Sequence, residues 1–103
     1  MHTAIADKKE ELAELCRRHG VIRLEVFGSA ARGTDFDPKS SDADFLVEFR
    51  LEGDRARLQQ YLNFAEALRQ ALGRSVDLVE SDAVRNPYLR AAINRSRELI
   101  YAS

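Results

Sequence analysis

The sequence predicts an α/β fold, in which helices cover a small mixed sheet of three strands. Two observations support this fold. Short β-branched and aromatic runs alternate with longer segments whose apolar residues recur at helical spacing, and glycines stand where these segments end. Strands interleaved with helices imply a layered structure, with the sheet covered mainly on one face and the other face available to a ligand. A length of 103 residues predicts a single domain over residues 1–103.

The first part of the chain predicts a helix, a strand and a tight turn. Apolar side chains recur at helical spacing over residues 3–19, and Gly20 follows as a helix stop. Residues 21–27 are rich in β-branched and aromatic side chains, as is typical of a strand. Gly28 ends this strand, and residues 29–32 are expected to form a short helical turn before the next glycine.

The middle of the chain predicts a loop, a second strand and a long helix. Residues 34–41 contain Asp, Pro, Lys and Ser and are expected to form a polar loop. Residues 42–49 follow as a strand. Leucines, alanines and a tyrosine recur at helical spacing over residues 54–72, and Gly73 ends this helix.

The last part of the chain predicts a third strand, a final helix and a tail. Residues 75–80 alternate, with Val76 and Leu78 facing one side of the sheet. A helix is expected from Pro87, a residue favoured at the first helical position, to about Arg97. Residues 99–101 are expected to pack as a short extended tail.

The composition excludes several classes of protein. A hydrophobic fraction of 45% with 32% charged residues belongs to a globular chain rather than a disordered one. The net charge of −1 gives no overall reason to expect binding to nucleic acid or to an acidic membrane. The single cysteine, Cys16, excludes an internal disulfide and fits a reducing cytosol. No apolar run reaches membrane-spanning length, so we expect a cytoplasmic protein with no membrane partner.

Two aspartates on the second predicted strand form the first half of a candidate site. Residues i and i+2 of a strand point to the same side, roughly 7 Å apart, so Asp42 and Asp44 are expected to project together. Two carboxylates this close raise each other's pKa unless a cation lies between them. Mg²⁺ prefers oxygen ligands and is commonly held by one or two carboxylates and substrate phosphates. The pair therefore predicts a magnesium site.

Asp77 adds a third carboxylate on another strand. It stands within the apolar run Val76–Val79, which is otherwise suited to burial, where an unpaired acid is costly. If this strand lies beside that of Asp42 and Asp44, the three carboxylates converge. Such a triad can hold two divalent ions and activate an oxygen for in-line attack at phosphorus. The structural alternative makes Asp42 a strand-entry residue, Asp44 a solvated position and Asp77 an ion-pair partner; we favour the site because independent features converge on it.

The Gly28-Ser29 turn supplies the phosphate half of the same candidate site. Phosphate can approach a glycine backbone without meeting a side chain, and Ser29 adds a hydroxyl beside free N–H groups. The alternative is an ordinary glycine turn in which Ser29 caps the following helix. Arg32 and Lys39 lie in or near the connecting segment, where they can reach a triphosphate or remain surface charges. The basic residues near the C-terminus, Arg85, Arg90, Arg95 and Arg97, fit a solvated helix face better than a nucleic-acid site.

Three segments together resemble a known family. VFGSAARG at residues 26–33, SDADFLV at 41–47 and VDLV at 76–79 closely resemble the minimal nucleotidyltransferases of the polymerase-β-like superfamily. The resemblance covers nearly the whole chain, with Ala30 a mild departure at a variable position. It implies the nucleotidyltransferase fold and transfer of a nucleoside monophosphate from a triphosphate to a hydroxyl, with pyrophosphate leaving.

The resemblance also implies roles for the residues of the candidate site. Gly28 and Ser29 would bind the triphosphate, with Arg32 assisting, and Asp42 and Asp44 would hold Mg²⁺. Asp77 would complete the metal site or act as general base. All three acids are present, so the site is expected to be active, with two Mg²⁺ ions and ATP as substrate.

The expected acceptor is a partner protein. Members of the resembled family commonly act as antitoxins that transfer AMP to a tyrosine of a HEPN-domain toxin, and larger relatives carry a further domain that helps bind the acceptor. This short chain is therefore expected to act on such a toxin. Two alternatives remain at this point: an antitoxin that neutralises its toxin by binding alone, and a stand-alone enzyme that acts on a small hydroxylated molecule.

Overall fold

The computed structural model describes residues 1–33, 42–50 and 57–103. The elements in chain order are α1 (Thr3–Ala6), α2 (Lys9–Arg18), β1 (Val21–Phe27), α3 (Ser29–Arg32), β2 (Ala43–Phe49), α4 (Arg57–Leu72), β3 (Val76–Glu80), the 3₁₀ helix η2 (Ser81–Ala83), α5 (Pro87–Ser96) and β4 (Glu98–Ala102). The predicted α/β class is confirmed. No helix among the described residues is both long and apolar enough to cross a membrane.

The sheet has four strands in the described part of the chain, in the order β3-β2-β1-β4. β1 is antiparallel to both β2 and β4, whereas β2 and β3 are parallel, so the sheet is mixed as expected. The predicted count of three strands is wrong because the expected tail at residues 99–101 pairs with β1. This pairing satisfies backbone groups along the edge of β1 and buries Ile100 in the main core.

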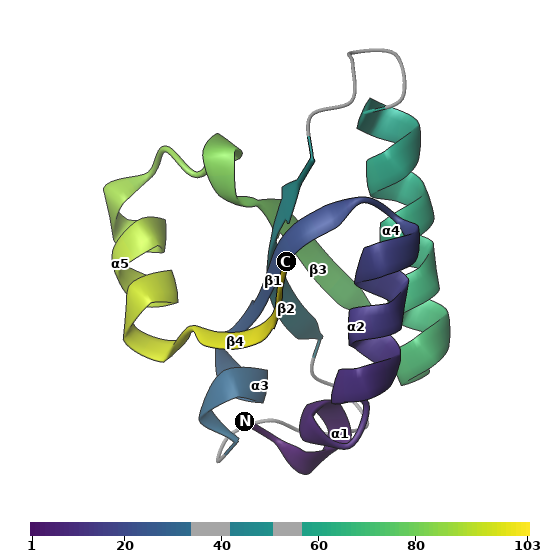
Figure 1. Ribbon diagram of the computed structural model, residues 1–103. Helices are drawn as coiled ribbons and strands as arrows, with labels where there is room; N and C mark the ends of the chain where they lie inside the picture. The colour runs from purple at the N-terminus through teal and green to yellow at the C-terminus, as the bar shows by residue number, and fades with distance from the viewer. Residues whose placement is uncertain (34–41, 51–56) are drawn as a thin grey trace.

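Helices cover both faces of the sheet, but unequally. α2 and α4 pack on one face and α5 lies against the other (Figure 1). The main core lies on the α2 and α4 side and includes Ala43, Phe45 and Val47 of β2, as the alternation of that strand predicts. A smaller apolar cluster lies under α5, on the opposite face, and consists of Phe27, Leu46, Val84 and Ile93. The second face is therefore only partly open to a ligand.

The predicted element bounds differ from the observed ones at a few points. The helix expected over residues 3–19 is divided into α1 and α2, and at the division the Lys8 N–H donates to the Ile5 carbonyl at 3.0 Å. Ile5 and Leu12 on either side are fully buried, so packing against the sheet sets the course of this segment. The expected loop at 34–41, including Lys39, and the first residues of the helix expected from 54 lie outside the described residues.

Candidate active site

The register of the sheet brings the predicted acids to one end of it. Asp44 pairs with Asp77 across the parallel β2 and β3 strands, and with Phe27 across the antiparallel β1 and β2 strands. Cross-strand partners share a face, so the Asp44 and Asp77 side chains leave the sheet on the same side. Asp42 directly precedes β2. The three carboxylates therefore lie next to the end of β1, where Gly28 begins the turn.

The pKa of Asp44 reflects the proximity of the three carboxylates. Burial, and then the charges of Asp77 and Asp42, raise the pKa of Asp44 from 3.8 to about 6. The charge of Arg32 lowers the same pKa. Three other predicted site residues, Asp77, Asp42 and Arg32, therefore act on one half-buried carboxyl group. Asp44 is not the solvated position that the structural alternative supposed.

Asp77 differs from the expectation in its exposure. Its position within an apolar run suggested burial, but its side chain is exposed. The reason is topological: β3 is an edge strand of the sheet, and Asp77 lies on the face that α2 and α4 do not cover. No described residue forms an ion pair with Asp77, so the role of ion-pair partner has no support in this part of the chain.

Gly28 occupies a position that only glycine tolerates. Its φ of 70° and ψ of −150° lie in a region that L side chains rarely adopt. A Cβ added at this position would lie 2.6 Å from Oδ2 of Asp44, well inside contact distance. The turn and the carboxylate are therefore in direct contact, which joins the two halves of the predicted site.

Ser29 does not play the structural role that the alternative gave it. The N-cap of α3 is Gly28, and Ser29 is the first helical residue. The Ser29 hydroxyl forms no hydrogen bond with any other described residue. It therefore remains available to a ligand at the end of β1.

The chemistry of the donor set fits a hard divalent cation, although the protein alone does not complete a site. Among the described residues, no group of three His, Cys, Asp or Glu side chains is arranged to hold a metal ion. Burial is the largest cause of the raised pKa of Asp44, and the repulsion from Asp77 and Asp42 that adds to it is the effect that a bound cation relieves. Mg²⁺ usually takes only one or two carboxylates and completes its coordination with water and phosphate oxygens.

Three residues at this end of the sheet escaped the sequence prediction. The Ser96 hydroxyl accepts a hydrogen bond from the Gly28 N–H at 2.9 Å. Arg97, expected on a solvated helix face, instead forms an ion pair with Glu25 of β1 at 2.6 Å. Glu25 and Arg97 are 72 positions apart in the chain, and no local pattern indicates such a contact.

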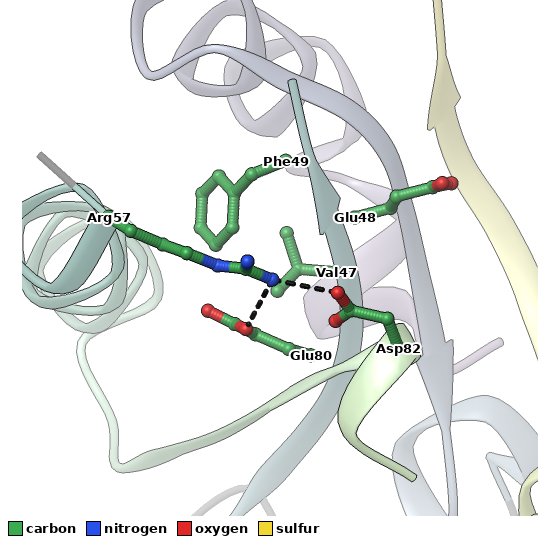
Figure 2. Close-up of a pocket in the computed structure, with 6 residues that line it drawn as sticks. All are labelled: Val47, Glu48, Phe49, Arg57, Glu80 and Asp82. Atoms are coloured by element: carbon green, nitrogen blue, oxygen red, sulfur yellow. Dashed lines mark hydrogen bonds and ion pairs between the residues drawn. The ribbon is translucent and has the colours of Figure 1, made fainter. Parts of the chain in front are cut away.

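A small pocket lies at the other end of β2 and β3 and is separate from the acids. Figure 2 shows the Arg57 guanidinium paired with both Glu80 and Asp82. The N–O distances of these two ion pairs are 3.4 and 2.7 Å. The remaining lining residues are Val47, Glu48 and Phe49. Because β2 and β3 are parallel, this pocket lies at their carboxyl ends, whereas the acids lie at their amino ends. It has no part in the candidate site.

Comparison with known proteins identifies the family. The profile of the nucleotidyltransferase domain family matches residues 8–100. The chain belongs to this family. The nucleotidyltransferase is 33% identical to protein adenylyltransferase MntA of Thermococcus cleftensis over 88 residues, which cover 85% of this chain and 81% of that protein. The resemblance drawn from the sequence motifs is therefore confirmed.

Solved structures agree with this assignment. A structure described provisionally as a minimal nucleotidyltransferase is 33% identical to the nucleotidyltransferase, covers 95% of each chain and superposes with a TM-score of 0.74. A second structure contains a tri-AMPylated HEPN toxin of Shewanella oneidensis in complex with an MNT antitoxin. Its matched chain is 18% identical, with a TM-score of 0.65 and coverage of 95% of this chain and 72% of that chain. At this identity the likeness concerns the fold alone.

Proposed function

We propose that this nucleotidyltransferase transfers AMP from ATP to a tyrosine hydroxyl of a partner HEPN toxin and thereby acts as its antitoxin. The observation that carries the proposal is the contact of the Gly28 turn with Asp44, whose carboxyl group also interacts with Asp42 and Asp77. A phosphate-admitting turn beside three carboxylates suits phosphoryl chemistry better than any other arrangement in the described part of the chain.

Each side chain then has a role in the transfer. Gly28 admits the triphosphate to the backbone, the Ser29 hydroxyl donates to a phosphate oxygen, and Arg32 offsets negative charge. The acceptor oxygen attacks the α-phosphorus as the bond from that phosphorus to the pyrophosphate oxygen breaks. Asp77, which is exposed beside Asp44, accepts the proton of the acceptor hydroxyl or completes the metal site.

Asp42, Asp44 and Asp77 are the residues that would hold Mg²⁺, expected as two ions. When bound, the metal neutralises charge on the triphosphate and polarises its phosphoryl oxygens. The raised pKa of Asp44 supports this assignment, because neighbouring carboxylates that destabilise one another in the free protein are stabilised by a cation.

The partner follows from the relatives rather than from a surface of this chain. A similar chain is named protein adenylyltransferase MntA, and a chain of the same fold is described as an antitoxin bound to an AMPylated HEPN toxin.

The decisive experiment removes two carboxylates and follows labelled AMP. We expect Asp42→Asn with Asp44→Asn to lower transfer onto the partner by at least about a thousandfold, because charge stabilisation at the phosphates is lost. The matched control is Asp7→Asn with Glu10→Gln, which neutralises two exposed carboxylates of the N-terminal segment and should leave transfer unchanged. Transfer at the wild-type rate by the site variant would contradict the assignment.

The same variant separates the alternatives. An antitoxin that works by binding alone predicts no transfer by the wild-type protein and full inhibition of the toxin by the double variant. A stand-alone enzyme predicts transfer to a small hydroxylated acceptor in the absence of any partner protein. Mass spectrometry of the partner after incubation with MgATP separates the proposed transfer from both alternatives, and the inhibition assay with the double variant and an assay on small acceptors separate the alternatives from each other.

A further inference from the structure

Gly28 is joined to a residue far away in the sequence. The Gly28 N–H donates to the Ser96 hydroxyl at 2.9 Å, and Ser96 is the last residue of α5. The Ser96 oxygen also lies 3.4 Å from the Ala92 carbonyl, one turn earlier in the same helix. The hydroxyl can therefore accept from Gly28 while donating to its own helix. This bond connects the candidate triphosphate turn to the end of α5.

The end of α5 is itself fixed to the sheet by a buried ion pair. Glu25 of β1 is only 3% exposed, and it is the one charged side chain buried among the described residues. Both of its oxygens are bound by Arg97: Nε donates to Oε2 and Nη2 donates to Oε1, each at 2.6 Å. Arg23 adds a further bond to Oε1 at 2.8 Å. Hydrogen bonds from Arg97 lower the pKa of Glu25 against the opposing effect of burial, so the carboxylate is ionised at neutral pH.

This ion pair attaches the carboxyl end of α5 to β1. Ile93 is the only buried side chain of α5, and it packs in the small cluster with Phe27 and Leu46. Arg97 directly follows Ser96, so the guanidinium that binds both oxygens of Glu25 also restrains the position of the Ser96 hydroxyl. A bidentate Arg–carboxylate pair is suited to this task because it restrains orientation as well as distance.

We propose that Ser96 is a positioning residue for the nucleotide site, held in place by the Glu25–Arg97 ion pair. The inference rests on the proposed function, in which the Gly28-Ser29 turn receives the triphosphate. Glycine can adopt many backbone conformations, and the hydrogen bond from the Gly28 N–H favours the observed one, with a φ of 70°. In that conformation the Gly28 backbone lies against the Asp44 carboxylate, so one hydroxyl aligns the phosphate half of the site with the metal half.

The first test removes the hydroxyl. Ser96→Ala should expose the Gly28 amide to solvent and speed its hydrogen exchange at least about tenfold, as followed by ¹⁵N NMR. Binding of a non-hydrolysable ATP analogue with Mg²⁺, measured by calorimetry, should weaken about five- to tenfold. In transfer assays KM for ATP should rise by a similar factor while kcat changes less than about twofold. Ser96→Thr keeps the hydroxyl and should restore all three values.

The second test asks whether Arg97 acts through Ser96. Arg97→Met should weaken analogue binding about fivefold in the wild-type background and have no further effect in a Ser96→Ala background, because the two residues serve one contact. Arg95→Met is the matched control, since Arg95 is exposed on the same helix and has no partner among the described residues. If Arg97→Met fails to fold, Arg97→Lys, which keeps the charge and loses the fork, should show the same dependence on Ser96 in weaker form.

The outcomes separate this inference from the proposed function. Wild-type affinity and wild-type Gly28 exchange in Ser96→Ala would overturn the inference while AMP transfer by the wild-type protein upholds the function. Additive losses in the Arg97 and Ser96 variants would likewise overturn it. Absence of AMP transfer, with analogue binding that still depends on Ser96, would overturn the function alone. Failure of the wild-type protein to bind the analogue would overturn both.

Discussion

Asp44 is the residue of the candidate site that contacts the Gly28 turn and interacts electrostatically with the other carboxylates. It lies beside Asp77 on one strand and against the Gly28 backbone on the other. Burial, and then the charges of Asp77 and Asp42, make its ionised form unfavourable in the free protein and raise the pKa of Asp44 to about 6. Because the folded pKa exceeds the unfolded value, the stability that protonated Asp44 contributes is fully present below pH 3.8 and is lost as pH rises through about 6.

Replacement of Asp44 by asparagine should therefore act on stability with a defined pH dependence. At pH 7.5 without divalent ions, we expect Asp44→Asn to raise the free energy of unfolding by about 1–2 kcal/mol, because the raised pKa of Asp44 makes its ionised form unfavourable in the folded chain and partial exposure reduces the effect. At about pH 3 the difference should nearly vanish, because Asp44 is then protonated in both the folded and the unfolded chain. Urea unfolding at the two pH values measures it, with Asp7→Asn as the control. An equal gain at both pH values would contradict the interpretation.

At the scale of elements, α5 is a helix held to a large extent at its two ends. Only Ile93 is buried along its length, so its packing against the sheet is slight. At its start the Asn86 side chain accepts hydrogen bonds from the Tyr88 and Leu89 amides at 2.9 and 3.4 Å. At its end Arg97 binds Glu25. Helix caps therefore contribute a larger share of the stability here than in α4, which buries Phe64, Ala65 and Leu68.

Removal of the cap should loosen α5 from its start. We expect Asn86→Ala to lower the free energy of unfolding by about 1 kcal/mol, because two amides of the first turn lose their acceptor. Amide exchange should quicken over the first turn of α5 and remain unchanged in α2. Asn86→Ser retains an acceptor and serves as the matched variant, with most of the stability expected to return. Uniform exchange across the helix in both variants would show that the cap is not the cause.

At the scale of the whole molecule, one face of the sheet carries the main core and the other carries the candidate site. The main core lies between the sheet and α2 and α4, and the acids lie on the face that α5 partly covers. Phe64 is fully buried at the centre of the main core, with its ring edge-on to Phe49 at 5.9 Å between centroids. Stability is therefore concentrated on one side of the sheet and the candidate chemistry on the other.

A large core deletion should separate stability from binding. We expect Phe64→Ala to lower the free energy of unfolding by about 3–5 kcal/mol through lost burial and the cavity left behind. Phe64→Leu, which should cost less, keeps the test usable if the alanine variant does not fold. In the folded variant the affinity for an ATP analogue should stay within about twofold of wild type by calorimetry. A loss of affinity in proportion to stability would show that the two faces are coupled.

The sequence by itself determined most of the elements and the motif residues of the candidate site. Alternation along β2 was enough to place Ala43, Phe45 and Val47 in the core and Asp44 on the opposite face, because strand geometry fixes the period of side-chain direction. The motif around Gly28 and the three aspartates indicated the family, which the comparisons confirm. These conclusions depend on the local sequence alone, because the alternation of a strand and the residues of a motif can be read without knowing the tertiary structure.

Only the tertiary structure decided which strands lie at the edges and which distant residues meet. Asp77 is exposed because β3 borders the sheet, and the tail became β4 because β1 had a free edge to pair. The contacts from Ser96 to Gly28 and from Arg97 to Glu25 join residues that are 68 and 72 positions apart in the chain. Such contacts form only when the whole chain folds around its core, so no local periodicity or motif predicts them.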